Sequence, residues 1–431
     1  MAAKSPYTFL IELPNHALYT IVLLLMRIRV KIMTKKKHVI ITGAGPVGCV
    51  SALIIAKAGI NVTLLEAERD LPLDMRASTF HPPTLDMLDE LGIVQEIINQ
   101  GLITPKFQYR DRQDGLIAEF DMTAITDFTK HPYRVQAEQY KLTRIISDIL
   151  KTYPHVDQRF HAKATNLQQD DSSVTVYFDS PDGPQSVQAD YLISCDGSRS
   201  FARKTLEIGF PGFTYPELFM VVSTTDDITD VVPDMCPVAY ITDPEEWCAV
   251  IRAPEMWRFL IPTDPDMTEE QLLDKDFLES RIQGFAPKKQ KYKISHSTLY
   301  PVNQRVAETY RKGRVLLAGD AAHVNNPLGG MGMNGGVHDG VNVSEKLVQI
   351  LNDGASDDLL DLYDRQRRPI AVEYVQAHTI RNKKIMEEKD RAIRKKRQDE
   401  IKGVLGDQKK SLELMMQVSM INSIKKSNAI I

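Results

Sequence analysis

The chain has 431 residues, of which 43% are hydrophobic and 26% are charged, and its formal net charge at pH 7 is -4. It is long enough to form two domains, or one large interleaved unit, around a sizeable core. The slightly acidic net charge argues against a nucleic-acid partner. So does the sequence pattern, which contains no basic repeat with interleaved aromatic residues. The four cysteines and ten histidines show no metal-ligand spacing, so we predict reduced thiols and no metal site.

The N-terminal segment is predicted to lie outside the folded core. The apolar run Ala17–Met26 has about half of the ~20 residues that a bilayer span needs, and basic residues follow it. That order is also atypical of a secretory signal peptide. Met33 begins a sequence typical of a cytosolic start, so we predict that residues 1–34 are an extension from a mis-assigned start. An interfacial contact of this segment with a membrane is the alternative, and a cytoplasmic location is expected.

The next stretch has the pattern of a strand, a glycine turn, a helix and a second strand. The expected elements are a strand at Val39–Ile41, a helix at Val50–Ala58 and a strand at Val62–Leu65. Gly43, Gly45 and Gly48 have the spacing of a dinucleotide-binding turn. Gly43 permits the tight turn, Gly45 lets the backbone approach a pyrophosphate, and Gly48 lets the helix pack closely. Glu66 ends the second strand, where a ribose-binding acid belongs. A dinucleotide is therefore expected at the start of the helix.

The middle of the chain alternates helix and hairpin patterns. We predict a loop entering a helix at Met75–Ile93, a hairpin around Asp114-Gly115, a helix at Gln136–Leu150, a second hairpin at Ser173–Ile193, and strands over 216–300. The stretch Trp257–Pro262 alternates like a strand packing on a core. Later, 341–351 and 359–381 have helical periodicity. From Arg381 onward Lys, Arg and Glu dominate, which favours a solvated helical face over a phosphate-lipid patch.

A glycine-dense segment follows the last predicted strand. The apolar run ends at Gly319-Asp320, and five glycines lie between Pro327 and Gly336. Glycine at this density weakens helices and strands, so the exposed backbone must serve a purpose. Asp320 can accept hydrogen bonds from sugar hydroxyls. The glycines expose consecutive N–H groups where a helix begins near Met333, and such a helix end stabilises negative charge on a conjugated ring.

Three motifs occur in a recognisable order: Gly43–Gly48 with Glu66, then Asp196–Arg203, then Gly319–His323 continuing through Pro327 to Asn334 and Asp339. Together they resemble the single-component FAD-dependent aromatic hydroxylases of the para-hydroxybenzoate hydroxylase and phenol hydroxylase type, over residues 37 to about 375. The expected fold is α/β, with a Rossmann-like FAD-binding domain interleaved with a β-rich substrate domain and followed by C-terminal helices. We assign 35–105, 136–215 and 301–380 to the FAD-binding domain, 106–135 and 216–300 to the substrate domain, and 381–431 to a helical tail.

The resemblance also implies how each motif would hold FAD. Gly43, Gly45 and Gly48 would cradle the pyrophosphate, and Glu66 would hold the adenosine ribose. Arg76 and Gln139 match positions that touch the phosphates and ribityl chain, and Asp196 and Arg203 match a motif used for FAD and NAD(P)H. Asp320 would contact the ribityl or pyrophosphate region. The isoalloxazine would be lined by Pro327, Gly330, Gly332, Met333 and Asn334. Pro327, Gly332 and Met333 form the loop closest to the chemistry. No side-chain base is assigned; the candidates are Tyr240, Tyr300 and His296.

The implied reaction is hydride transfer from NAD(P)H to FAD, capture of O2 as a C4a-hydroperoxide, and transfer of an OH group to a phenolic or related small aromatic substrate. The protein would position the substrate and exclude water. Gly340 departs from the family pattern, where Ala is usual, and we expect this to affect packing more than chemistry. The sequence predicts neither the oligomeric state nor a choice between NADH and NADPH.

Two other functions stay open at this point. Trp257–Pro262 approaches the Trp-x-Trp-x-Ile-Pro signature of flavin-dependent halogenases, with Phe259 in place of the second Trp. Product formation that depends on halide would identify a halogenase. A non-catalytic flavin-binding module for redox sensing is the other alternative, and the basic C-terminal tail favours it. It predicts bound flavin with negligible NAD(P)H turnover.

Overall fold

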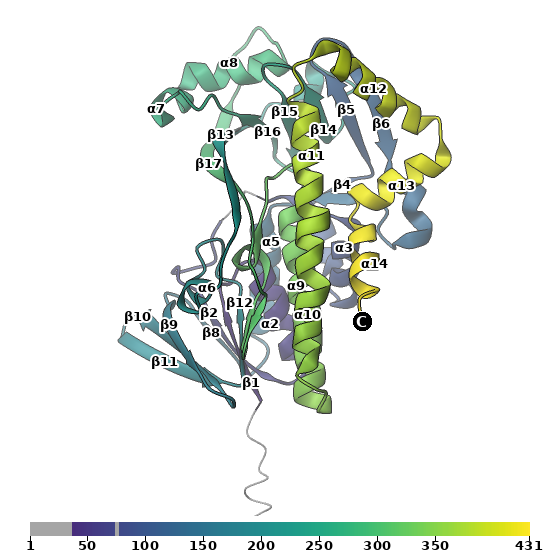
Figure 1. The fold of residues 1–431 in the computed structure, drawn as a ribbon. Helices are drawn as coiled ribbons and strands as arrows, with labels where there is room; N and C mark the ends of the chain where they lie inside the picture. The colour runs from purple at the N-terminus through teal and green to yellow at the C-terminus, as the bar shows by residue number, and fades with distance from the viewer. Residues whose placement is uncertain (1–36, 74–76) are drawn as a thin grey trace, which may run out of the picture. The chain divides into compact units, whose positions relative to one another are not determined.

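The computed structural model describes residues 37–73 and 77–431, and His38–Ile431 form one compact unit (Figure 1). The predicted N-terminal extension, with its membrane-contact alternative, and Arg76 lie outside the described residues. Within the described ranges, no helix is both long and apolar enough to cross a bilayer. The expected α/β fold with C-terminal helices is confirmed.

A parallel sheet contains the first βαβ unit. In the described part of the chain it has the strand order β18-β19-β12-β1-β2-β8, and β18 pairs antiparallel to β19. The strands are β1 (His38–Thr42), β2 (Asn61–Leu65), β8 (Val156–Arg159), β12 (Tyr191–Ser194), β18 (Arg311–Lys312) and β19 (Val315–Leu317). Val39, Ile40 and Ile41 of central β1 are fully buried, as expected for a parallel strand covered on both faces. The helix α2 (Pro46–Lys57) packs against α5 (Gln139–Leu150) and α9 (Met331–Val348).

A larger sheet contains the strands predicted over 216–300. Its order is β20-β17-β13-β16-β15-β14-β5-β6, and the pair β14 and β5 is parallel. The strands are β5 (Lys106–Asp111), β6 (Gly115–Asp121), β13 (Gly212–Thr224), β14 (Val238–Thr242), β15 (Cys248–Ala253), β16 (Met256–Pro262), β17 (Ile294–Val306) and β20 (His323–Val324). The predicted hairpin at Asp114-Gly115 is the β5–β6 turn, where Gly115 has a φ of 77°. Gly212, at the start of β13, pairs with Arg305 near the end of β17.

Side chains alternate across this larger sheet, so its two faces differ. One face, called the inner face below, carries Phe107, Phe219 and Tyr240, which pack with Leu328 of the glycine-dense segment and Met386 of the C-terminal helices. The opposite, outer face packs against α8 (Lys275–Phe285). The short α7 (Glu269–Leu272) and α8 interrupt the region predicted as strands. Their starts are capped by side chains, Thr268 for α7 and Asp274 for α8, which favours helix at these positions.

Two three-stranded sheets complete the described β structure. One contains β9 (Lys163–Gln169), β10 (Val174–Ser180) and β11 (Gly183–Ala189); the other contains β3 (Thr79–Phe80), β7 (Arg134–Gln136) and β4 (Leu102–Thr104). The hairpin predicted at Ser173–Ile193 is therefore wrong beyond Ala189. Tyr191–Ser194 is apolar without alternation and fully buried, so it joins the parallel sheet instead. Asp190 marks the break, and its carboxylate accepts the His38 N–H at 3.0 Å.

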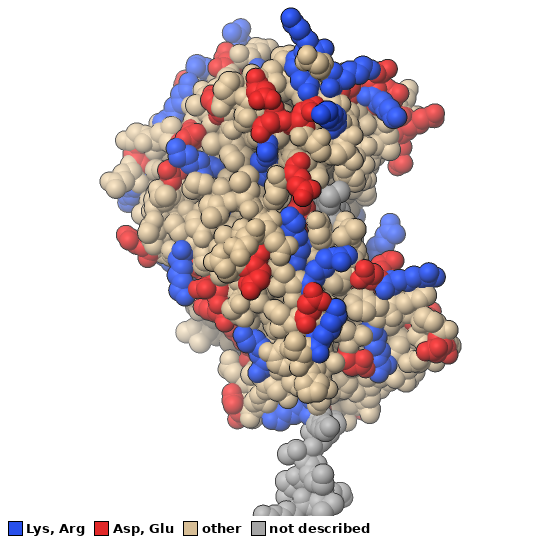
Figure 2. Space-filling view, turned by 180° about the vertical axis from the view of Figure 1, so that it is seen from behind, with Lys and Arg blue, Asp and Glu red and all other residues tan. Residues whose placement is uncertain are grey.

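The remaining elements are helical. Along the chain they are α3 (Pro82–Glu90), α4 (Val94–Asn99), η1 (Met122–Phe128), α6 (Phe201–Thr205), η2 (Ile228–Asp230), η3 (Gly319–Ala321), η4 (Gln349–Asp353), α10 (Asp358–Ile370), η5 (Ala371–Gln376), α11 (Ala377–Met386), α12 (Arg391–Leu405), α13 (Gln408–Val418) and α14 (Ile421–Asn428). Figure 1 shows α10 and α11 as one continuous rod. The charged α12 buries Gln398 alone of its residues, so the predicted solvated face is confirmed for α12, whereas Lys383 and Met386 of α11 are buried. Figure 2 shows Lys and Arg interspersed with Asp and Glu over the face in view.

Candidate active site

The first glycine turn leaves no room for side chains at two of its three glycines. Gly43 has a φ of 90°, and a Cβ there would lie 2.4 Å from the carbonyl oxygen of Cys195. A Cβ at Gly48 would lie 1.9 Å from the carbonyl oxygen of Gly43. A Cβ at Gly45, in contrast, would meet no atom within 4 Å. This open space lies at the start of α2, which no side chain caps. A pyrophosphate fits there, because it needs close backbone approach and free N–H groups.

Glu66 lies beside this turn. Its side chain is buried, with 8% exposed, and its carboxylate accepts the N–H groups of Ala44 at 2.7 Å and Glu68 at 3.0 Å. A cavity of about 550 Å³ opens at the residues that follow; it is lined by Ala67, Glu68, Arg69, Asp70, Pro72 and His161. The carboxylate is therefore fixed between the glycine turn and a space that can admit a nucleoside.

Asp196 and Arg203 organise a loop next to the parallel sheet. Asp196 accepts hydrogen bonds from the Ser194 hydroxyl at 2.5 Å and from the N–H of Phe201, the first residue of α6, at 2.7 Å, while Ser200 caps the helix. Arg203 is 5% exposed. Its guanidinium donates to the carbonyl oxygens of Ala321 and Ser198, each at 2.7 Å. The second and third sequence motifs are thus joined through one buried cation.

The glycine-dense segment ends at a helix that begins earlier than predicted. α9 starts at Met331 instead of near Met333, after Gly330 with a φ of 65°, and no side chain caps it. The first N–H groups of a helix have no partner within it, so those of Met331, Gly332 and Met333 are available. Asp320 is exposed in the turn before this segment. Pro327, Gly332 and Met333 are each half-buried.

Val47 brings this segment against the first glycine turn. A Cβ at Gly319 or at Gly336 would lie 2.8 Å from a methyl carbon of Val47. Gly336 is therefore required for α9 to approach α2 so closely, and Gly319 is required for the same approach by η3. Gly340 belongs to the same contact: a Cβ there would lie 2.8 Å from the Ser51 hydroxyl oxygen. The departure from the family's usual Ala is explained by packing against Ser51.

Asn334 holds the glycine-dense segment in place instead of presenting its amide to solvent. The residue is fully buried. Its Oδ1 accepts from the His81 N–H at 2.9 Å and the Thr84 hydroxyl at 2.7 Å. Its Nδ2 donates to the carbonyl oxygens of Thr79 at 2.8 Å and Gly330 at 2.6 Å. The side chain is thus fully used within the protein.

A buried ionic cluster lies behind α9. Asp339 accepts hydrogen bonds from His323 Nε2 at 2.8 Å and from Arg367 Nε at 2.7 Å. Burial raises the pKa of the Asp339 carboxyl, but the Arg367 and His323 charges outweigh it and hold the pKa below its usual range. The sequence motifs include His323 and Asp339 but not Arg367, His81, Thr84 and His338. Nothing in the single sequence marks these four residues.

The other predicted residues fall at two places. Gln139 begins α5, and its N–H donates to Ala77 at 3.0 Å beside the undescribed residues 74–76. The candidate bases Tyr240, Tyr300 and His296 lie on strands of the larger sheet: the Tyr240 ring is 5.5 Å from that of Tyr109, and that of Tyr300 is 6.3 Å from Phe219. Burial, reinforced by the charge of Arg258, lowers the pKa of His296.

The signature residues of the halogenase-like stretch do not face the inner side of the sheet, whereas Leu260 between them does. Trp257, Phe259 and Ile261 are buried in the core of the outer face with α8. Trp257 donates its indole N–H to Asp227 at 3.0 Å. The packing interpretation of this stretch is confirmed, and it gives no support to a halogenase site. Among the described residues, no cluster of three or more His, Cys, Asp and Glu is arranged to bind a metal.

Comparison with known proteins gives consistent matches. Residues 36–378 match the family model described as "FAD binding domain". The chain is 33% identical over 361 residues to para-nitrophenol 4-monooxygenase of Pseudomonas sp. strain WBC-3, covering 83% of this chain and 89% of that protein. It is 32% identical over 344 residues to 6-hydroxy-3-succinoylpyridine 3-monooxygenase HspB of Pseudomonas putida S16, covering 80% of this chain and 87% of that protein.

A solved structure matches in the same way. The crystal structure of p-nitrophenol 4-monooxygenase PnpA from Pseudomonas putida DLL-E4 superposes with a TM-score of 0.85 at 31% identity. The match covers 91% of this chain and 98% of that one. The similarity therefore includes both large sheets and the C-terminal helices.

Proposed function

This chain belongs to the FAD-dependent aromatic hydroxylases, and we propose that it hydroxylates a phenolic ring with electrons from NADH or NADPH and one oxygen atom of O2. The observation that carries the proposal is the contact of Val47 with Gly319 and Gly336. It packs the first turn of α2, which is suited to a pyrophosphate, against η3 and against the second turn of α9, whose uncapped start is suited to a ring. Leu328 of the same segment packs with the aromatic inner face of the larger sheet, on which a substrate ring could lie.

We assign the FAD-holding roles as follows. The pyrophosphate turn is formed by Gly43, Gly45 and Gly48, and Glu66 binds the adenosine ribose. The ribityl and phosphate region is held by Asp320, Gln139 and Arg76. The flavin ring is lined by Pro327, Gly330, Gly332 and Met333. Asn334, Asp196 and Arg203 act by positioning, because their side chains are bonded within the protein. The flavin, when bound, supplies hydride acceptance and oxygen activation. The start of α9 would stabilise negative charge on its ring.

The substrate class follows from the relatives and from the inner face. The two relatives reported above are named for action on a nitrophenol and on a hydroxypyridine, so a small ring bearing a hydroxyl is proposed. The aromatic rings of Phe107, Tyr109 and Phe219 offer stacking or edge contacts to such a ring. We retain the division into FAD-binding and substrate domains as a proposal. A cytoplasmic location is also proposed, and the four cysteines form no disulfide.

The test is aerobic consumption of NADH and of NADPH by the FAD-loaded protein with a panel of phenols that includes 4-nitrophenol. Isotopically labelled O2 reports whether one oxygen atom enters the product. We expect substrate-stimulated oxidation and one labelled oxygen per product. Asp320→Ala should lower FAD retention, whereas Asp182→Ala, at an exposed turn, is the matched control. Bound FAD with no stimulated oxidation and no labelled product for any phenol would refute the proposal and favour a flavin-binding module.

A further inference from the structure

Arg134 is a buried arginine with no anionic partner in the ranges 37–73 and 77–431. It belongs to β7, and 2% of it is exposed. Its Nε atom is enclosed and makes no hydrogen bond. The guanidinium lies 4.9 Å from the centre of the Phe107 ring. Buried charges are normally paired, because leaving one unpaired is costly. The site therefore favours any anion that can reach it.

Arg134 lies between the glycine-dense segment and the inner face. On one side is His81, whose pKa is lowered by burial and then by the charge of Arg134. The Nε2 atom of His81 is hydrogen-bonded to the Gly329 carbonyl oxygen at 2.8 Å. On the other side are Phe107 and Tyr109, whose ring centres are 6.0 Å apart. A group held at Arg134 would thus be close to both the proposed flavin loop and the aromatic face.

A second unpaired donor lies on the same side of β7. Gln136 is two residues from Arg134, so their side chains point the same way along the strand. Its Oε1 accepts the Thr79 hydroxyl at 2.8 Å, and its Nε2 is buried without a partner. Thr79 in turn contacts Gly330, where a Cβ would lie 3.0 Å from the Thr79 Cβ. Two buried donors therefore lack an acceptor beside the glycine-dense segment.

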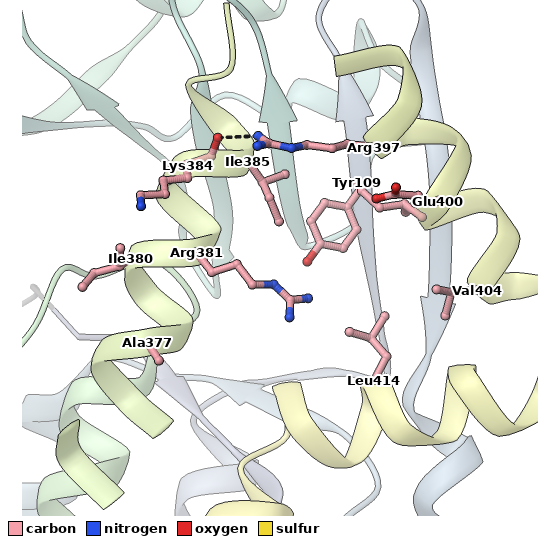
Figure 3. A pocket seen from close by; sticks show the side chains of 11 residues that line it. Tyr109, Ala377, Ile380, Arg381, Lys384, Ile385, Arg397, Glu400, Val404 and Leu414 are labelled. Atoms are coloured by element: carbon pink, nitrogen blue, oxygen red, sulfur yellow. Dashed lines mark hydrogen bonds between the residues drawn. The ribbon is translucent and has the colours of Figure 1, made fainter. Parts of the chain in front are cut away.

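An open cavity of about 620 Å³ reaches Tyr109 from outside. Its apolar wall includes Ile385, Ile401, Val404 and Leu414. Figure 3 shows the side chain of Arg381 extending from α11 into this space, toward the hydroxyl of Tyr109. Burial raises the pKa of Tyr109 to about 12, and the charges of Arg134 and Arg381 both oppose that rise. The charges of both arginines therefore act on Tyr109: Arg381 lies in the cavity, and Arg134 lies over the neighbouring Phe107 ring.

We propose that an aromatic anion enters by the cavity at Tyr109 and places its anionic oxygen at Arg134, with Arg381 as the outer charge that guides it. This deepens the proposed function, on which it rests, by giving the substrate a charge state and a partner. The anionic oxygen belongs to a phenolate or to a ring carboxylate. In either case the apolar cavity wall accepts the ring, and Gln136 supplies a further donor.

The first test measures equilibrium binding to the FAD-loaded protein through the flavin absorbance. The probes are 4-nitrophenolate, 4-nitrobenzoate and neutral 4-nitroanisole. We expect the protein to bind one of the anions more tightly than the neutral ether. Arg134→Met should reduce that preference by at least about tenfold, since losing one partner of a buried charge pair costs at least this much. Arg134→Lys should keep part of it, because the charge remains.

Thermal unfolding without added ligand separates this role from a structural one. Removing an unpaired buried charge should leave the midpoint of Arg134→Met equal to or above that of the unmodified protein. If Arg134 had only a structural role, the Arg134→Met substitution would lower the unfolding midpoint. An unchanged preference for the anions in a folded, FAD-loaded Arg134→Met protein would overturn the inference.

Rapid-mixing kinetics test the outer arginine. Charges at a rim change association rates more than dissociation rates, so Arg381→Gln should slow association and weaken its dependence on salt. Arg365→Gln is the matched control, because Arg365 is exposed on α10. Equal association rates in both variants would refute entry beside Arg381. If the protein hydroxylates a phenol but binds the anions equally well without Arg134, only the inference is refuted. If anion binding depends on Arg134 but no labelled product forms, only the proposed function is refuted.

Discussion

The guanidinium of Arg203 donates a hydrogen bond to the backbone carbonyl of Ala321 across 2.7 Å, joining segments 118 residues apart. A second bond to the Ser198 carbonyl and a contact of 3.7 Å with the centre of the Phe210 ring fix the same side chain. Arg203 therefore determines where the turn containing Asp320 lies relative to the Asp196 loop.

The substitution Arg203→Lys should loosen that turn. An ammonium group is a point charge that lacks the planar fork and stacks poorly on Phe210. We expect a loss of about 2 kcal/mol in the free energy of unfolding, the value of one hydrogen bond to a charged group, together with weaker FAD retention. Urea unfolding and flavin content after gel filtration measure the two effects. Arg199→Lys, in the same loop but exposed, should change neither.

The glycines of the first turn should separate folding from cofactor binding. Gly48→Ala places a Cβ 1.9 Å from the Gly43 carbonyl oxygen, and overpacking of this kind costs about 1–3 kcal/mol. Gly45→Ala meets no protein atom, so the apoprotein should keep its stability and FAD should bind more weakly. Thermal unfolding of the apoprotein and titration with FAD distinguish the two variants. Equal destabilisation of both apoproteins would contradict the assignment of the open space.

Asn334→Asp should disturb the glycine-dense segment without changing side-chain size. The new carboxylate would face the carbonyl oxygens of Thr79 and Gly330, which now accept hydrogen bonds. We expect a loss of about 3 kcal/mol in the free energy of unfolding, because buried acceptors would oppose one another. Asn342→Asp is the control on the same helix, where Lys346 already donates to Asn342 Oδ1 at 2.9 Å. An unchanged free energy of unfolding in Asn334→Asp would show that the Asn334 contacts are dispensable.

Stability should fall in acid partly through His338. Burial, reinforced by the charge of Arg367, lowers the pKa of His338 from its usual 6.5 to about 3. Between these two values the unfolded chain binds the proton and the folded chain does not, so stability falls as pH falls below 6.5. The slope approaches about 1.4 kcal/mol per pH unit for one such group. His338→Gln should flatten the fall between pH 6.5 and pH 5, measured by urea unfolding. An unchanged slope would show that His338 is protonated in the folded state.

The sequence predicted best what is local. The βαβ unit and its glycines follow from short-range spacing, so the strand, turn and helix appear at the predicted places with α2 beginning earlier, at Pro46. The start of α9 was predicted near Met333 and lies two residues earlier, at Met331, because the left-handed turn is at Gly330. The end of the second hairpin was also wrong, since burial on both faces moved Tyr191–Ser194 into another sheet.

The buried polar contacts could not be predicted from spacing. Asn334 meets the backbone of His81 over a separation of 253 residues, and no local pattern relates the two. Arg134 precedes a predicted helix in the sequence, and only the fold shows that it has no anionic partner among residues 37–73 and 77–431. The roles of such residues depend on which segments the two large sheets bring together.

The pairing of Gly212 with Arg305 means that the segment 212–305 leaves the rest of the chain and returns to it at neighbouring positions. For protein engineering, this segment is an exchangeable cassette with two adjacent junctions. The first junction must stay glycine, because a Cβ at Gly212 would lie 1.9 Å from the Gln304 carbonyl oxygen. A grafted cassette must also match β5 along the parallel edge of β14. If the proposed domain division holds, exchanging this segment should change substrate preference and leave the turn at Gly43–Gly48 in place.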